Sequence, residues 1–242
     1  MLSVIPAKVS VFILIVAAIF LLAGCDSGNL VLQENFEKPN KFKKRWEVIN
    51  GQWSVANSAV TGVQNSDWAV MLSRKKLPDD FILTFAARME PYSVLFEVLL
   101  GFKDEKYLGV YVYEIENTVA IEDRSLFLGE KHVQERTYIR STGNIGMLPR
   151  QNYQFNYDWN VWKIQKSGNR LLVWINNEPG IGYNDTQGLL QPGGRFGFAL
   201  KGQGLIQNVQ LFDTKDEAPP SFAEFETKSS RKIENPFFLF SE

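Results

Sequence analysis

The chain has 242 residues, of which 45% are hydrophobic and 13% aromatic, so it can form one sizeable core and is not an intrinsically disordered protein. Its formal net charge is −1, from 26 basic and 27 acidic residues, and this balance gives no electrostatic basis for binding nucleic acid. The sequence also contains no glycine-rich phosphate loop of the P-loop or Rossmann kind.

The N-terminal segment has the pattern of a secretory signal. Lys8 is the only charged side chain before Asp26, and the apolar run from Val11 to Leu22 is shorter than the roughly 20 residues of a transmembrane helix. The run ends in Leu22-Ala23-Gly24-Cys25, which closely resembles the lipobox of bacterial lipoproteins. We therefore expect a signal peptide over residues 1–24 and a tether over residues 25–32; the alternative is an uncleaved anchor with an incidental cysteine.

The lipobox resemblance implies an address in the bacterial cell envelope. In that family the cysteine is acylated, so we expect Cys25 to hold the protein on the periplasmic or extracellular side of a membrane. Asp26, the next residue, is typical of retention in the inner membrane in some lineages. Because Cys25 is the only cysteine, the chain has neither an intrachain disulfide nor a thiol left for catalysis.

The mature chain alternates apolar and polar residues in short runs. Asn35 to Lys44 is polar, with Phe36 and Phe42 as packing points, and no stretch shows helical periodicity over three turns. The expected strands are 46–48, 51–55, 60–63, 68–72, 81–86, 94–102, 106–114, 119–123, 161–166, 171–175, 195–200 and 205–212. Glycine-rich turns between short strands predict an all-β sandwich of two antiparallel sheets, which we place at residues 33–213.

Three stretches do not fit this strand pattern. Pro179 cannot donate to a strand ladder, which argues against a central strand there. Residues 125–149 are less regular and contain the only histidine, His132, so we expect a long loop with one strand near 135–139. Residues 214–242 are expected to form a flexible tail, ending in the apolar peptide Phe237–Phe240, which either packs on the sandwich or docks on a partner.

Several of these segments together resemble a known family. Gly51-Gln52-Trp53-Ser54-Val55 and Gly193-Gly194-Arg195-Phe196-Gly197-Phe198 resemble motifs of concanavalin A-like and laminin-G-like jelly-roll domains, in the 3-keto-disaccharide hydrolase-like subgroup. The hairpin from Trp159 to Asn176 and the closing strand at Ile206–Val209 fit the same pattern. The resemblance implies two curved sheets packed face to face and a protein that binds or cleaves carbohydrate, or serves in adhesion.

The sequence offers little support for catalysis. Glucanases of this fold carry two carboxylates in a Glu-x-Asp-x-x-Glu motif, which is absent here. Glu114 and Glu116 share a strand face at i, i+2, but the simpler interpretation is a solvated strand end, and Glu122 and Asp123 fall on opposite faces. A single histidine excludes a two-histidine metal site, and we expect no catalytic residue and no cofactor.

A row of tyrosines is the best candidate for a binding site. Tyr107, Tyr111 and Tyr113 fall on one face of a strand, opposite an apolar face, and Glu97 lies nearby if its strand pairs with the region of Tyr111. Tyrosine rings suit stacking on sugars, whereas the alternative is ordinary cross-strand aromatic pairing.

These observations predict a lipid-anchored carbohydrate-binding module without catalysis. The alternatives are a glycoside hydrolase or lyase with an unfamiliar site, and a structural partner protein that docks through Phe237–Phe240. A structural calcium at Asp185 or Asp213 is allowed by their oxygen-rich turns but not required.

Overall fold

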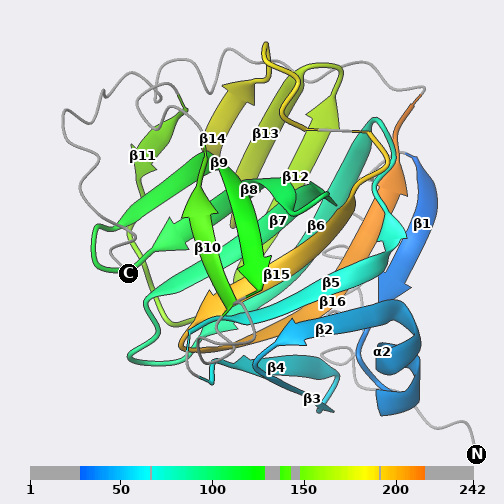
Figure 1. Ribbon diagram of the computed structural model, residues 1–242, viewed down its shortest axis with the longest axis vertical. Helices are drawn as coiled ribbons and strands as arrows, with labels where there is room; N and C mark the ends of the chain where they lie inside the picture. The colour runs from blue at the N-terminus through cyan, green and yellow to red at the C-terminus, as the bar shows by residue number, and fades with distance from the viewer. Residues whose placement is uncertain (1–27, 66, 129–136, 143–147, 191, 216–242) are drawn as a thin grey trace, which may run out of the picture.

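Two antiparallel sheets packed face to face make up the protein (Figure 1). The computed structural model describes residues 28–65, 67–128, 137–142, 148–190 and 192–215. Sheet A has the strand order β14 (Glu178–Asn184), β13 (Arg170–Ile175), β12 (Asn160–Ser167), β6 (Phe81–Met89), β16 (Gln203–Asp213), β4 (Ala59–Val63) and β3 (Gln52–Ala56), with β1 (Asn29–Glu34) paired to β16. Sheet B has the order β10 (Thr137–Ser141), β9 (Thr118–Leu128), β8 (Lys106–Tyr113), β7 (Leu95–Lys103), β15 (Arg195–Lys201), β5 (Ala69–Lys76) and β2 (Trp46–Asn50), with β11 (Arg150–Asn152) paired to β9. The predicted sandwich is confirmed.

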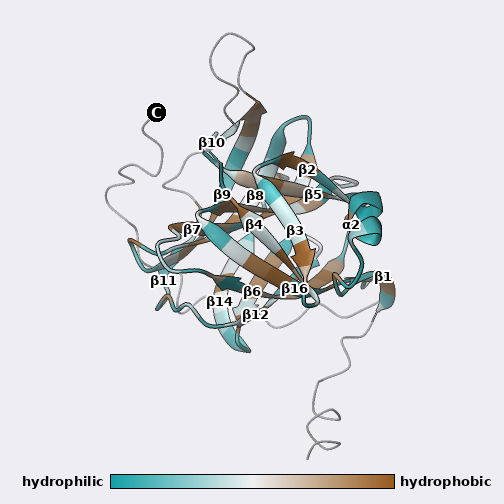
Figure 2. Ribbon diagram, turned by 90° about the horizontal axis from the view of Figure 1, so that it is seen from below, coloured by the Kyte–Doolittle hydropathy of each residue, from teal (hydrophilic) through white to brown (hydrophobic). Residues whose placement is uncertain are grey.

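An aromatic cluster fills the space between the sheets. Phe85 of sheet A stacks on Trp162 with ring centroids 5.7 Å apart, and it meets Phe198 of sheet B edge-on at 5.0 Å. Trp46 is also buried and packs against Phe198 at 5.7 Å. The apolar segments lie where the two sheets face each other, whereas the short helix at the edge is polar (Figure 2). Burial of these rings supplies the main driving force for packing the two sheets together.

The hairpin formed by β7 and β8 follows the predicted pattern. Leu108, Val110 and Val112 point into the core, and the turn between the strands places Asp104 and Glu105 at positive φ. A turn with two such residues matches the right-handed twist of the flanking strands. The register pairs Glu97 with Tyr111, which meets the condition under which Glu97 was expected to lie near the tyrosines.

The sandwich begins earlier in the chain than expected. The segment predicted to be a tether forms most of β1, in which Asn29 pairs with Asp213 and Glu34 with Val209. The tether assignment is therefore wrong for residues 29–32. The reason is non-local, because the strand becomes ordered through its backbone ladder with a partner about 180 residues away in sequence.

Three other segments differ from the predictions. The polar stretch after β1 contains a helix, α2 (Pro39–Arg45), which begins with proline and has Phe42 as its buried residue, while Phe36 is buried just before it. In the expected loop 125–149, β9 continues to Leu128, which was not predicted, and pairs with β10, which lies close to the strand predicted near 135–139. The sequence did not predict β14, which contains Pro179; it lies at the edge of sheet A, where a residue without an N–H donor is tolerated, and not in a central position.

Some predictions lie outside the described residues. These are the signal peptide, Cys25, His132 and the tail with Phe237–Phe240. Within the part of the chain that the structure describes, no helix is both long and apolar enough to cross a bilayer.

Candidate functional site

The candidate site lies on the outer face of sheet B, which is the face turned away from the core. Side chains alternate along β8, so Tyr107, Gly109 and Tyr111 lie on this face while their neighbours point into the sandwich. Tyr107 is 2% exposed and Tyr111 is 0% exposed, whereas Tyr113 is partly exposed. The structure confirms that the three tyrosines share a face, but the rings of Tyr107 and Tyr111 are not open to a ligand.

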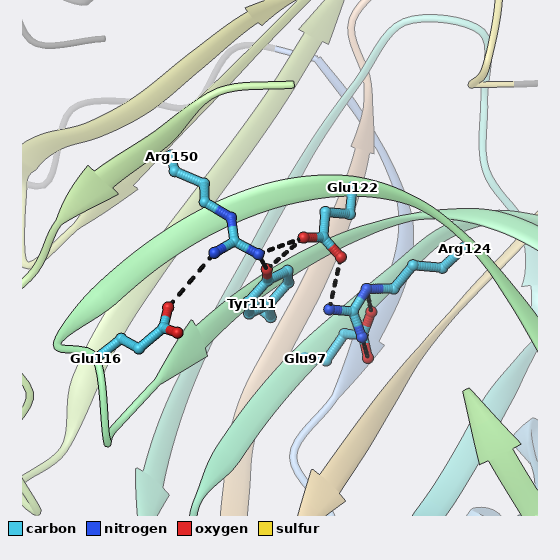
Figure 3. Close-up of polar contacts among 6 residues, drawn as sticks. All are labelled: Glu97, Tyr111, Glu116, Glu122, Arg124 and Arg150. Carbon is cyan, nitrogen blue, oxygen red and sulfur yellow. Dashed lines mark hydrogen bonds and ion pairs between the residues drawn. The ribbon is translucent and has the colours of Figure 1, made fainter. Parts of the chain in front are cut away.

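Two carboxylates and two arginines surround Tyr111 and form a buried network (Figure 3). The Glu97 carboxylate lies 3.4 Å from Nε of Arg124, and Nη2 of the same arginine lies 3.0 Å from Oε2 of Glu122. The Arg124 guanidinium also stacks over the Tyr111 ring, 4.2 Å from its centroid. One arginine from β9 therefore joins carboxylates of two different strands, β7 and β9. We call Glu97, Tyr111, Glu122, Arg124 and Arg150 the buried network.

Arg150, which begins β11, closes the other side of this network. Its Nη2 donates hydrogen bonds to Oε1 of Glu122 at 2.6 Å and to the Tyr111 hydroxyl at 2.9 Å. The Tyr111 hydroxyl in turn donates to the same Glu122 oxygen at 2.7 Å. Nη1 of Arg150 lies 3.4 Å from Glu116, which connects the buried network to the turn between β8 and β9. Charge-assisted hydrogen bonds of this kind fix side-chain positions strongly.

Gly109 makes room for the contact across β8. A Cβ atom at this position would lie 2.2 Å from Oε1 of Glu97 and 2.9 Å from Cδ of Arg124. Glu97 on β7 and Arg124 on β9 therefore meet directly over Gly109, because β8 lies between their strands. Any larger residue at position 109 would push them apart.

The environment drives the pKa values of the two carboxyl groups in opposite directions. Burial raises the pKa of Glu97 to about 7, although the nearby Arg124 opposes this shift. Burial also disfavours the charge on Glu122, but the two arginines and Tyr111 outweigh it and lower the pKa of this group. Burial raises the pKa of Tyr107, whose hydroxyl is close enough to Glu97 to interact but makes no well-aligned hydrogen bond.

Separated pKa values are typical of an acid and base pair, but this pair is enclosed. Glu97 is 0% exposed and Glu122 is 1% exposed, and both contact Arg124. A general acid must reach the substrate atom that it protonates. In this structure the ion pairs fix the positions of Glu97 and Glu122, but neither carboxylate is accessible to a substrate.

The other acidic residues considered from the sequence have different roles. Glu114 and Glu116 lie in the turn after β8 and not on a strand face, so the shared face assumed for them is wrong. Asp185 accepts hydrogen bonds from the backbone N–H groups of Leu189 and Leu190, which occupies both of its carboxylate oxygens. Among the described residues, no group of three or more His, Cys, Asp or Glu side chains is arranged to hold a metal ion.

Sequence reasoning missed Arg124 and Arg150 and the burial of Glu122. The available signal was the spacing of Glu122, Arg124 and Leu126, which continues the alternation of β9 into the stretch interpreted as a loop. Arg150 carried no such signal, because β11 is only three residues long and its pairing with β9 is visible only in the structure.

The sequence matches no protein-family model and no curated protein. Solved structures do match the fold. The carbohydrate-binding module CBM66 from Bacillus subtilis is 13% identical, with 69% of this chain and 95% of that chain covered and a TM-score of 0.52. A protein of unknown function with a galectin-like fold from Bacillus subtilis is 13% identical, with 77% and 97% covered and a TM-score of 0.57.

An enzyme is among the similar structures as well. The β-agarase B from Zobellia galactanivorans is 8% identical, with 77% of this chain and 94% of that chain covered and a TM-score of 0.53. At these identities the likeness concerns the fold alone. Together with the two-sheet topology, it shows that the chain has the concanavalin A-like, galectin-like jelly-roll fold.

Proposed function

We propose that the protein is a lipid-anchored, extracytoplasmic module that binds carbohydrate without cleaving it. The fold supports the ligand class, because the similar structures include a carbohydrate-binding module and an agarase. The observation that carries the choice of binding over cleavage is the contact of both Glu97 and Glu122 with Arg124. A retaining glycosidase needs two carboxyl groups about 5 Å apart that both face the sugar.

A binding assay with the full-length chain in detergent tests this function. The chain is applied to a glycan array and to agarose oligosaccharides, and the reducing ends of any bound saccharide are measured over time. We expect saturable binding with no release of new reducing ends. Absence of binding to every glycan would overturn the proposal.

The second candidate is a glycoside hydrolase, and the opposed pKa shifts of Glu97 and Glu122 favour it. In this case an opening of the outer face would expose Glu97 as the acid and Glu122 as the charged partner. The Glu97→Gln and Glu122→Gln variants then lose turnover of a glycan that both still bind. If the wild-type chain releases reducing ends and both variants do not, the hydrolase reading replaces the binding module.

The anchor has its own test. In the proposal, Cys25 bears the acyl chains and residues 1–24 are removed. The Cys25→Ser variant is expected to leave the membrane fraction, and the mature protein is expected to lose the mass of the lipid. An unchanged mass and membrane fraction for Cys25→Ser would show that the anchor assignment is wrong.

A further inference from the structure

One end of the sandwich carries exposed and half-buried aromatic side chains that the buried network does not include. At this end, the β6–β7 connection, the β8–β9 turn and the segment before β12 come together. The Glu114 N–H donates to the Val94 carbonyl at 2.9 Å, and the Tyr153 N–H donates to the Asn117 carbonyl at 2.7 Å. These bonds hold the three segments side by side.

Two aromatic residues of the segment before β12 contact each other, and one of them also contacts a carboxylate of the β8–β9 turn. Phe155 and Tyr157 form an edge-on pair with centroids 5.2 Å apart, and the Tyr157 hydroxyl lies 3.3 Å from Oε1 of Glu114. Tyr92 is 97% exposed and Tyr157 is 40% exposed. Partial burial, followed by the charges of Glu114 and Tyr92, raises the pKa of Tyr157.

We call Tyr92, Tyr113, Ile115, Phe155 and Tyr157 the end patch. Tyr113 is the last member of the tyrosine row on β8 and the only one of the three that keeps part of its surface exposed. Ile115, in the β8–β9 turn, is 63% exposed. The predicted row of tyrosines therefore reaches solvent at this end and nowhere else along β8.

The backbone at Tyr92 is strained. The Ser93 N–H donates to the Glu90 carbonyl at 3.1 Å, Pro91 occupies the second position of the turn, and Tyr92 has φ +69° at the third. This is the pattern of a type II turn, whose third position favours glycine or asparagine. A tyrosine there is disfavoured by the contact of its Cβ with the backbone, and nearly all of its ring is in water.

Firm contacts hold this turn against the next strand. The Ser93 hydroxyl donates to the Gln203 carbonyl at 2.7 Å and accepts from the Gln203 N–H at 2.9 Å. A Cβ atom on Gly202 would lie 2.5 Å from Cα of Ser93, so the two segments pack at backbone distance. Tyr92 is therefore presented to solvent from a fixed support, and strained residues held in this way are found preferentially at functional sites.

Polar groups that can bind hydroxyls lie around these rings. Glu114 already accepts a hydrogen bond from Tyr157. Two residues before Tyr92 in the chain, Glu90 accepts a hydrogen bond from Arg88 at 2.6 Å, and the same guanidinium stacks over the Trp159 ring at 5.5 Å. Flat apolar faces beside fixed hydrogen-bonding groups match a sugar ring, which has a C–H face and a rim of hydroxyl groups.

We propose that the end patch is the saccharide-binding site, in which Tyr92 and Tyr157 stack on sugar rings while Glu114 accepts hydrogen bonds from their hydroxyl groups. This inference rests on the proposed carbohydrate-binding function and places that function at the end of the sandwich, outside the outer face of sheet B. Stacking on exposed rings needs no opening of the buried network.

The test compares two patch variants with a matched control on the full-length chain, using the glycan that binds best on the array and agarose oligosaccharides as probes. Tyr92→Gly and Tyr157→Ala are each expected to raise the Kd by at least about tenfold, the scale of one lost ring contact. Tyr138→Ala is the control, because Tyr138 is 39% exposed, like Tyr157, but lies on β10 at the far end of β9. Its Kd should not change.

Stability separates loss of the ligand contact from loss of the fold. Glycine suits the turn better than tyrosine, so Tyr92→Gly is expected to keep the Tm or raise it by up to roughly 4 °C while it weakens binding. Binding that persists in both patch variants would overturn the site while leaving the carbohydrate function intact. Failure of the wild-type chain to bind any glycan would overturn both.

Discussion

On the inner face of β8, Leu108 and Val110 are fully buried among apolar side chains, whereas on the outer face Tyr111 is equally buried but sits among charged groups. The strand is the same and the exposed fraction is the same, but the chemistry that makes burial favourable differs. Removal of apolar surface from water stabilises the inner face. On the outer face each buried charge costs free energy unless an opposite charge compensates it.

The largest loss of stability is expected when Arg124, the shared partner of the Glu97 and Glu122 carboxylates, is replaced. Arg124→Met keeps an apolar stem of similar length but leaves Glu97 and Glu122 buried without that guanidinium. We expect a loss of about 3–5 kcal/mol in the free energy of unfolding, measured by urea denaturation of the full chain. Arg140→Met, at an exposed position on the neighbouring strand β10, should cost less than about 1 kcal/mol. Equal losses in the two variants would contradict the proposed role of the buried charges.

The second prediction uses pH to distinguish the two carboxylates of the network. The pKa of Glu97 is about 7 in the folded chain and near 4.5 when unfolded, so folding holds the proton on this group. Its contribution to stability is full below pH 4.5 and is lost as the pH rises towards 7, by about 3 kcal/mol in total. The pKa of Glu122 is lowered, so its contribution has the opposite sign and is lost as the pH falls below 4.5.

Glu97→Gln should therefore flatten the decline in stability between pH 4.5 and 7, because glutamine does not titrate. Denaturation midpoints measured at several pH values in that range check this expectation. Glu178→Gln, at the exposed first residue of the edge strand β14, should leave the slope as it is in the wild type. A wild-type chain whose stability does not fall over this range would refute the prediction.

The third prediction concerns the glycine between the two charged strands. Gly109→Ala places a methyl group against Glu97 and Arg124, which must move apart. We expect a loss of about 1–3 kcal/mol, the usual cost of overpacking a buried site. Combining Gly109→Ala with Glu97→Ala removes the nearest contact, so the double variant should recover part of the loss in a double-mutant cycle. Strict additivity would show that the clash is not with Glu97.

The two faces of β8 also differ in how far the sequence alone predicts them. Alternation along β7 and β8 correctly predicted the hairpin and its faces, because these follow from local periodicity and turn chemistry, and the observed register then pairs Glu97 with Tyr111. The alternation of residues along a strand shows which side chains share a face, but it does not show which other segments pack against that face. The burial of Tyr111 and the position of Arg150 depend on segments distant in sequence, and so does the pairing of β1 with β16.

An ion pair at the surface should contribute less to the free energy of unfolding than the ion pairs of the buried network. Arg195 and Glu47 form an ion pair between β15 and β2, and their side chains remain 27% and 37% exposed. Water already solvates both charges, so Glu47→Gln should change the free energy of unfolding by less than about 1 kcal/mol. Even this effect should disappear in about 1 M salt, where the screening length is only ~3 Å. The loss from Arg124→Met should persist in that salt, because Glu97 and Glu122, which lose this partner, are buried out of reach of solvent ions. If salt removed both effects equally, burial would not be what separates the charges of the network from those of the surface.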